Sequence, residues 1–288
     1  MKLYPIQCGN FKLDGGAMFG VVQKSLWERT NPADSKNLIE LGTRSLLVKK
    51  KKKLILIDCG LGNKQDEKFF GHYSLYGDES LDKNLKKYGF VIEDITDVFL
   101  THLHFDHCGG AIEWNDDKSG YRPAFKNAQF WTNENHWQWA TEPNPREKAS
   151  FLKENILPMQ ESGQLQFLPT PKTGNYGFAP DLKMDVIFVD GHTEKQMLPV
   201  IQYQEKTIVF AADLIPTAGH IPQVYVMGYD TRPLLTMEEK GKFLKQCVEN
   251  EYLLFFEHDA HHELASLKMT EKGVKLDETF SFNEVFGY

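Results

Sequence analysis

Residues 101–110 carry the stretch Thr-His-Leu-His-Phe-Asp-His-Cys-Gly-Gly, which places three histidines and one aspartate within six positions. The apolar run at 97–101 is typical of a short buried strand, so the cluster starts where a strand ends. An irregular loop there can point several side chains toward one centre, and zinc accepts imidazole and carboxylate ligands. A solvated or helix-capping loop is the alternative. The pattern favours a metal site with four candidate ligands: His102, His104, Asp106 and His107.

Three later segments end in the same way, with a candidate ligand after an apolar, strand-like run. His192 follows such a run and a glycine, Asp213 ends the next run, and His258 follows the last one. Each of these residues taken alone is more often structural than functional. Together with the histidine cluster they indicate one shared site, in which the carboxylate of Asp213 could bridge two cations and lower the cost of placing them close together.

The apolar pattern along the chain predicts strands followed by helices, twice over, which indicates an α/β fold with two sheets and helices outside them. Five lysines at 49–53 lie between two apolar runs and predict a solvated hairpin turn rather than a nucleic-acid or membrane patch. Extended segments broken by two glycines are expected at 11–23. Helices are expected at 81–88, 145–157 and 237–250.

The region at about 133–168 contains two helical patterns and is expected to be a helical insertion or lid. Aromatic residues are dense where it begins, and they predict an apolar pocket wall or lid, with ordinary core packing as the alternative for each one. They are Phe130, Trp131, Trp137 and Trp139. The same aromatic surface fits a homodimer interface, so the oligomeric state stays open.

Length and composition fit one large globular domain over 1–288, with 41% apolar and 25% charged residues. The net charge of −7 repels a phosphate backbone, so nucleic acid is not an expected partner. Four scattered cysteines without a CxxC pair indicate reduced thiols and a cytoplasmic location. Neither a signal-peptide stretch nor an 18-residue apolar window is present, so secretion and a membrane span are not expected.

The sequence here resembles a known family. The stretch THLHFDHCGG is similar to the HxHxDH signature of the metallo-β-lactamase superfamily, and DGH at 190–192, AAD at 211–213 and EHD at 257–259 are similar to its later motifs, in order. The four motifs are spaced as in the branch that contains N-acyl homoserine lactonases and methyl parathion hydrolase. The resemblance covers nearly the whole chain. It implies an αββα sandwich with a helical insertion.

The resemblance also implies a set of ligands for two divalent metal ions. One ion would be held by His102, His104 and His192, and the other by Asp106, His107 and His258, with Asp213 bridging them. Asp58 lies in a segment similar to the family's strand-end IDxG motif and would orient a ligand. Because position 104 is a histidine and not the glutamate of the di-iron flavoprotein relatives, zinc is favoured, while other divalent metals remain open.

Two cations at one site would lower the pKa of a bridging water toward neutrality, so that the resulting hydroxide can attack while the substrate's carbonyl or phosphoryl oxygen is polarised. No serine or cysteine nucleophile is then needed. Asp106 is expected to hold the hydroxide or to pass a proton to the leaving group. For Cys108, a buried apolar role is favoured over a role as nucleophile or ligand.

Three residues are candidates for substrate contact: His220, Phe19 and Trp27. A surface position is the alternative for His220. The other histidines are not expected to bind metal. His72 and His136 carry no supporting context, and His261 and His262 are expected to cap or decorate a helix.

The function that these patterns favour is hydrolysis of a small, partly apolar ester, lactone or organophosphate-like ester. Lactonases carry a tyrosine three positions after the bridging aspartate, but here that position is Pro216, and Tyr225 or Tyr229 could replace it. One alternative is a thioester hydrolase resembling glyoxalase II, although no clear basic patch for glutathione is found. A nuclease is disfavoured by the acidic balance. A non-catalytic metal-stabilised binding protein is a further alternative, but such a protein usually loses ligands and this chain has all seven.

Overall fold

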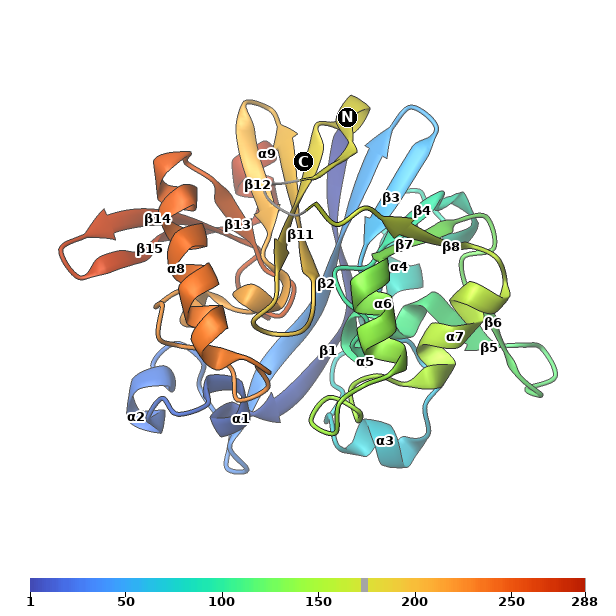
Figure 1. The fold of residues 1–288 in the computed structure, drawn as a ribbon, viewed down its shortest axis with the longest axis horizontal. Coiled ribbons are helices and arrows are strands. Elements are labelled where there is room, and N and C mark those ends of the chain that lie inside the picture. The colour runs from blue at the N-terminus through green and yellow to red at the C-terminus, as the bar shows by residue number, and fades with distance from the viewer. Residues whose placement is uncertain (172–175, 288) are drawn as a thin grey trace. The chain divides into compact units, whose positions relative to one another are not determined.

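The computed structural model describes residues 1–171 and 176–287. Its contacts divide the chain into two compact units, each of which is described here by itself. Unit 1 consists of Met1–Asn10 and Thr43–Thr173, and unit 2 consists of Phe11–Gly42 and Gly174–Tyr288. Figure 1 shows strands and helices in both units, so the α/β class predicted from the apolar pattern is confirmed.

The sheet of unit 1 has the strand order β1-β2-β3-β4-β7-β8, and its first two strands continue into unit 2. Its strands are β1 (Lys2–Asp14), β2 (Leu38–Lys50), β3 (Lys53–Ile57), β4 (Asp97–Phe99), β7 (Gln129–Asn133) and β8 (Leu165–Leu168). Strands β2 and β3 form an antiparallel hairpin, while β3, β4, β7 and β8 run parallel. Because parallel strands end at one edge of a sheet, Asp58, Thr101 and Asn133 all lie near that edge.

Helices and a small two-stranded sheet make up the rest of unit 1. They are α3 (Glu67–Gly71), α4 (Leu81–Lys87), η1 (Ile92–Asp94), α5 (Phe105–Cys108), η2 (Gly109–Ala111), β5 (Ile112–Trp114), β6 (Tyr121–Pro123), α6 (Glu134–Thr141) and α7 (Lys153–Glu161). Side-chain caps explain where two helices start, since Ser80 accepts a hydrogen bond from Lys83 N and Asn133 accepts one from His136 N. Apolar side chains from these strands and helices form one buried core in unit 1.

The sheet of unit 2 has the order β15-β14-β13-β12-β11-β10-β9. Its strands are β9 (Tyr176–Ala179), β10 (Met184–Val189), β11 (Gln196–Tyr203), β12 (Lys206–Phe210), β13 (Leu253–Phe255), β14 (Leu264–Thr270) and β15 (Gly273–Phe280). Strands β12 and β13 pair in parallel, and β10 and β12 both pair antiparallel with β11. Strands β10, β12 and β13 therefore point the same way, and the three predicted ligands that follow them belong to one edge of this sheet.

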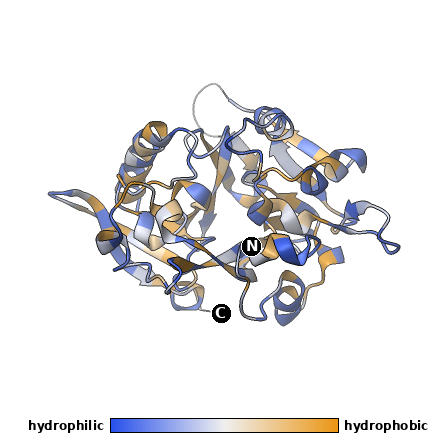
Figure 2. Cartoon of the chain, turned by 90° about the horizontal axis from the view of Figure 1, so that it is seen from below, coloured by the Kyte–Doolittle hydropathy of each residue, from blue (hydrophilic) through white to orange (hydrophobic). Residues whose placement is uncertain are grey.

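The helices of unit 2 are α1 (Gly15–Phe19), α2 (Lys24–Trp27), η3 (Pro180–Leu182), η4 (Ala212–Leu214), η5 (Ala218–His220), α8 (Pro233–Glu249) and α9 (Phe282–Phe286). Helix α8 packs on β14 and β15 and buries an apolar face that includes Phe243, Leu244 and Cys247. Figure 2 shows apolar colour along many strands, whereas the helices carry both polar and apolar residues. No described helix is both long and apolar enough to cross a bilayer.

Several predicted elements are confirmed. The lysine run at 49–53 contains the turn between β2 and β3, the helix expected at 81–88 is α4, and the strand before the histidine cluster is β4. The insertion region contains α6 and α7, and its role as a lid stays a prediction.

Three predicted boundaries are wrong. Residues 15–19 form α1 rather than an extended segment, because the side chain of Asp14 accepts a hydrogen bond from Ala17 N at 2.8 Å and caps a helix there. The helix expected at 145–157 begins only at Lys153, since Asn144 Oδ1 accepts the N–H of Arg146 and holds that segment in a turn. Helix α8 starts before the predicted 237, at Pro233, because proline needs no N–H partner in a first helical turn.

Candidate metal centre

In unit 1, His102 and His104 point ring nitrogens at each other from the loop after β4. Nε2 of His102 lies 3.0 Å from Nδ1 of His104, and the other nitrogen of His102 lies 3.1 Å from the hydroxyl of Thr101. Two ligands at 2.0 to 2.1 Å from a tetrahedral zinc ion are about 3.3 Å apart. The spacing of the two nitrogens therefore fits ligands that share one ion.

Asp58 holds two parts of the same loop. Its carboxylate accepts hydrogen bonds from the backbone N–H of Thr101 at 2.8 Å and from the Thr101 hydroxyl at 2.6 Å, and it lies 3.1 Å from Nδ1 of His107. The backbone of Asp58 has a φ of 55°, a left-handed conformation that is uncommon for a non-glycine residue. His107 is thus oriented through Nδ1, and its Nε2 lies 3.9 Å from a carboxylate oxygen of Asp106.

The two glycines after the histidine cluster are required by a close backbone approach. A Cβ atom at Gly109 would lie 2.1 Å from the carbonyl oxygen of Leu61, and one at Gly110 would lie 2.1 Å from that of Cys59. Beside them, Cys108 is fully buried and its thiol donates to the carbonyl of Leu103 at 3.3 Å. Burial raises the pKa of Cys108 to about 12, so the thiol stays protonated, as the predicted packing role requires.

In unit 2, Asp213 faces two histidines at once. One carboxylate oxygen lies 3.1 Å from Nε2 of His192, and the other lies 3.1 Å from Nε2 of His258. All three side chains are buried. A carboxylate whose two oxygens each face one imidazole has the geometry of a ligand that bridges two cations.

Hydrogen bonds fix the opposite nitrogens of these two rings. Nδ1 of His258 donates to the carbonyl of Gly42 at 2.8 Å, so the neutral ring has a lone pair at Nε2. Two acceptors 3.1 Å apart repel each other unless a cation or a proton lies between them, and the donor set suits a divalent cation. Nδ1 of His192 lies 2.9 Å from a carboxylate oxygen of Asp230.

The charges around His192 favour a positive group. Burial alone lowers the pKa of His192, but the carboxylates of Asp213 and Asp230 outweigh it and raise this pKa to about 10. The two carboxylates therefore stabilise a positive charge at this imidazole, whether it comes from a proton or from a bound cation.

The turn that carries His192 is held by the first part of α8. The carboxylate of Glu239 accepts the backbone N–H groups of Asp190 and Gly191 at 2.8 and 2.9 Å, and a Cβ atom at Gly191 would lie 2.4 Å from Thr236 N. The glycine of the DGH motif thus allows α8 to approach the turn closely.

The three predicted substrate contacts form one buried stack in unit 2. The ring of Phe19 lies 4.1 Å from that of His220 and 5.2 Å from that of Trp27, and it stacks on both. Nε2 of His220 donates to Met18 O at 2.9 Å, and Nδ1 accepts from the Thr217 hydroxyl at 2.8 Å. Burial lowers the pKa of His220 to about 3, so this histidine is a neutral interior residue. The alternative prediction, a histidine at the surface, is wrong. A contact with substrate stays a prediction.

The aromatic residues around the insertion pack in the core or hydrogen-bond to carboxylates, and Trp139 does both. Phe130 and Trp137 belong to the core of unit 1, and Trp139 packs against it. The indole N–H groups of Trp131 and Trp139 donate to carboxylates, those of Asp97 and Glu147.

The structure also shows residues beside the predicted ligands that the sequence motifs did not identify. Asp230, Glu147 and His136 contact predicted ligands or the loop that carries them, and no motif or spacing in the sequence marks them. The expected helix at His261 and His262 is wrong. Both backbone N–H groups donate to the side chain of Asp259 in the turn before β14.

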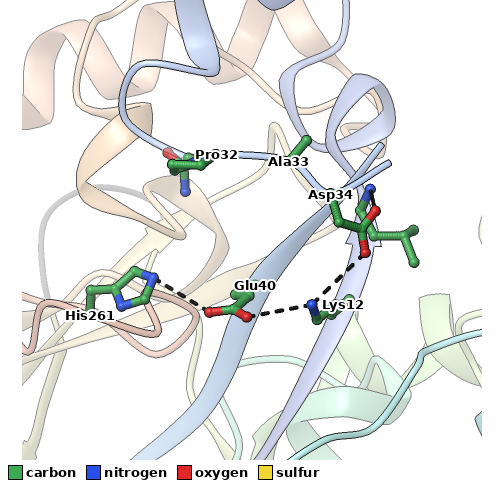
Figure 3. A pocket seen from close by; sticks show the side chains of 8 residues that line it. Lys12, Pro32, Ala33, Asp34, Glu40 and His261 are labelled. Carbon is green, nitrogen blue, oxygen red and sulfur yellow. Dashed lines mark hydrogen bonds and ion pairs between the residues drawn. The ribbon is translucent and has the colours of Figure 1, made fainter. Parts of the chain in front are cut away.

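A separate pocket on unit 2 lies beside β1 and β2 (Figure 3). Its charged groups pair among themselves: Lys12 lies 3.4 Å from Glu40 and 3.9 Å from Asp34, and His261 lies 3.7 Å from Glu40. The lysine of the pocket is therefore already paired with both of the carboxylates that line it.

Comparison with known proteins agrees with the fold and with the motifs. Residues 38–246 match the metallo-beta-lactamase superfamily, and the chain belongs to that family. It is 23% identical over 275 residues to an N-acyl homoserine lactonase of Bacillus cereus. This match covers 91% of this chain and 94% of the relative. It is 24% identical over 182 residues to the lactonase of Bacillus thuringiensis, and this match spans 62% of each protein.

Solved structures show the same fold. A probable metal-dependent hydrolase from Staphylococcus aureus superposes with a TM-score of 0.86 at 27% identity, over 97% of this chain and 96% of that one. AidC, a dizinc quorum-quenching lactonase, superposes with a TM-score of 0.77 at 23% identity, over 97% and 95% of the two chains. The predicted metallo-β-lactamase fold is confirmed.

Proposed function

We propose that this protein is a hydrolase with a dinuclear zinc centre. The observation that carries the proposal is the pair of 3.1 Å distances that join the two oxygens of Asp213 to His192 and His258. The 3.0 Å spacing of the nitrogens in His102 and His104 supports it. The proposed ligands are those that the family resemblance implies: His102, His104, Asp106, His107, His192, Asp213 and His258.

Two bound divalent ions would supply an activated water and would polarise a carbonyl or phosphoryl oxygen. The chain's own residues prepare the ligands for this chemistry. Asp58 and Asp230 hold Nδ1 of His107 and His192, which leaves Nε2 of each ring for an ion. Asp106 is proposed to accept the proton that is released and to pass it to the leaving group.

The proposed substrate is a small ester, lactone or organophosphate-like ester. The names of the lactonase relatives support this class, and the departure at Pro216 argues against simple transfer of lactonase chemistry. Tyr225 is the proposed substitute for the missing tyrosine. Its ring packs edge-on against Phe19, 6.3 Å away, in the unit that also carries Asp213.

The proposal extends to the whole chain. We take it to act as one domain, with the helical segment at about 133–168 as an insertion. The four free cysteines support a reducing, cytoplasmic setting.

Elemental analysis combined with hydrolysis assays tests the proposal. About two zinc ions per chain are expected, and turnover of one class in a panel of aryl esters, lactones, phosphotriesters and a glutathione thioester should be lost on chelation and restored by zinc. His261→Gln is the matched control, because His261 is 63% exposed in its side chain and is not a proposed ligand. Full turnover by protein that holds no metal would overturn the proposal. Turnover of the thioester alone would contradict the proposed substrate class and favour a thioester hydrolase.

A further inference from the structure

Three hydrogen-bond contacts around His104 are among those that attach the segment of α6 and the turns after it to the histidine loop, all within unit 1. Nε2 of His136 accepts the backbone N–H of Leu103 at 2.8 Å, and the N–H of Phe105 donates to the carbonyl of Ser150 at 3.0 Å. Between these two contacts, Oε1 of Glu147 lies 3.3 Å from Nε2 of His104. The first two contacts therefore hold the backbone on either side of His104, and the third reaches its ring.

Glu147 is a buried carboxylate that is held in one orientation. It is 3% exposed, and its second oxygen accepts the indole N–H of Trp139 at 2.7 Å and the side-chain amide of Asn144 at 2.6 Å. These two donors hold Oε2, and Oε1 faces Nε2 of His104. Each N–H that a buried carboxylate accepts offsets part of the cost of its burial, and the imidazole of His104 is placed to supply one.

A hydrogen bond from His104 to Oε1 of Glu147 selects one tautomer of His104. An ionised carboxylate only accepts hydrogen bonds, so Nε2 must carry the proton. The neutral ring then has its lone pair at Nδ1, the nitrogen that lies 3.0 Å from Nε2 of His102. One contact with Glu147 therefore prepares His104 to bind an ion through the nitrogen that faces His102.

We propose that Glu147 is a positioning residue of the metal centre and that the segment at 134–152 is a fixed support of the histidine loop, coupled to metal binding. The inference rests on the proposed function, because it concerns an ion bound by His104. Coupling of this kind is reciprocal: if the ordered segment favours the ion, the ion stabilises the ordered segment. Outer partners of this type typically change metal affinity by 10- to 100-fold.

Glu147→Gln is the informative variant because it keeps the size of the side chain. If its oxygen faces Trp139 and Asn144, its amide NH2 meets the N–H of His104. If it is turned round, the NH2 meets the two donors instead. A donor therefore meets a donor in either orientation, and the tautomer is no longer fixed.

The test is a competitive titration of zinc with a chelator, together with hydrogen exchange of residues 134–152 in apo and zinc-loaded protein. In the wild-type protein, zinc should raise the protection of this segment. In Glu147→Gln, affinity for one of the two ions should fall by 10- to 100-fold, and the zinc-dependent gain in protection should shrink. The matched control is Glu142→Gln, an exposed glutamate of the same segment, which should behave as the wild type does.

The outcomes separate this inference from the proposed function. If the wild-type protein binds no metal, the proposed function fails. If it binds two ions and Glu147→Gln binds both with unchanged affinity, only the inference about Glu147 is overturned. Should that variant not fold, Trp139→Phe removes one donor to Glu147 and keeps the carboxylate. A smaller loss of affinity for one ion is then expected, and unchanged affinity would overturn the inference.

Discussion

The carboxylate of Asp230 lies 2.9 Å from Nδ1 of His192, so it fixes the orientation of that imidazole from the side opposite to Asp213. The contact joins residues that are 38 positions apart in the chain. Both side chains are buried, and the charge of Asp230 contributes to the raised pKa of His192.

Asp230→Asn should therefore weaken metal binding without unfolding unit 2. The amide can still accept a hydrogen bond, but the negative charge behind His192 is lost, and affinity for one ion should fall by roughly 10- to 100-fold. Chelator titration measures this effect. Asp185→Asn, at an exposed site on β10, is the control. Equal zinc affinity in Asp230→Asn and the control would show that Asp230 contributes packing only.

Asp106→Asn tests the proposed proton transfer. Loss of a positioned acid or base typically lowers kcat by about 10²- to 10⁴-fold, so a drop in this range is expected in protein that is reconstituted to full metal content. The measurement is kcat with the zinc content of the same sample. Asp117→Asn, at an exposed turn in unit 1, should be silent. Unchanged turnover at full metal content would remove Asp106 from the mechanism.

Gly110→Ala tests the close approach of two loops in unit 1. A Cβ atom would lie 2.1 Å from the carbonyl of Cys59, so backbone must move, and the free energy of unfolding should fall by about 2 kcal/mol or more. Gly71→Ala is the control, because a Cβ atom there meets nothing within 4 Å and alanine is the better helix former. Denaturant unfolding of the apo proteins measures both. Similar stability of the two variants would contradict the close approach.

The proposed ligands could be picked out in the sequence because each one lies in a local pattern: a dense cluster, or a polar residue directly after an apolar run. Glu147 could not be predicted in this way. It lies 43 positions from His104 and has no pattern of its own, and only folding of the insertion brings it there. Likewise, the two glycines after His107 mark a turn in the sequence, while the carbonyl groups that require them belong to a distant strand end.

Helix starts were predicted less well than strands for a related reason. The apolar spacing that indicates a helix shows which face is buried, but the first residue depends on hydrogen bonds of single side chains. Asp14 starts α1 and Asn144 delays α7 through such bonds. Strands β10 to β13 were easier, because their apolar runs are buried and end at sharp turns.

Lys240 gives a prediction about pH that concerns a residue outside the proposed set of metal ligands. Its side chain is buried in α8 and donates to the carbonyl of Tyr225 at 2.7 Å, and burial lowers its pKa to about 7, only partly offset by Asp230. An unfolded lysine has a pKa near 10.4. Between these two values the unfolded chain binds a proton that the folded protein lacks, so the free energy of unfolding should rise with pH in this window.

Lys240→Met should remove that dependence. Relative to the variant, the wild-type protein should gain roughly 2 to 4 kcal/mol of stability between pH 6.5 and pH 9.5, because one pKa unit corresponds to about 1.4 kcal/mol. Unfolding of the apo proteins at several pH values measures the difference. Lys245→Met, an exposed lysine on the same helix, should keep the wild-type slope. Parallel pH profiles for wild type and Lys240→Met would mean that Lys240 keeps its charge in the folded protein.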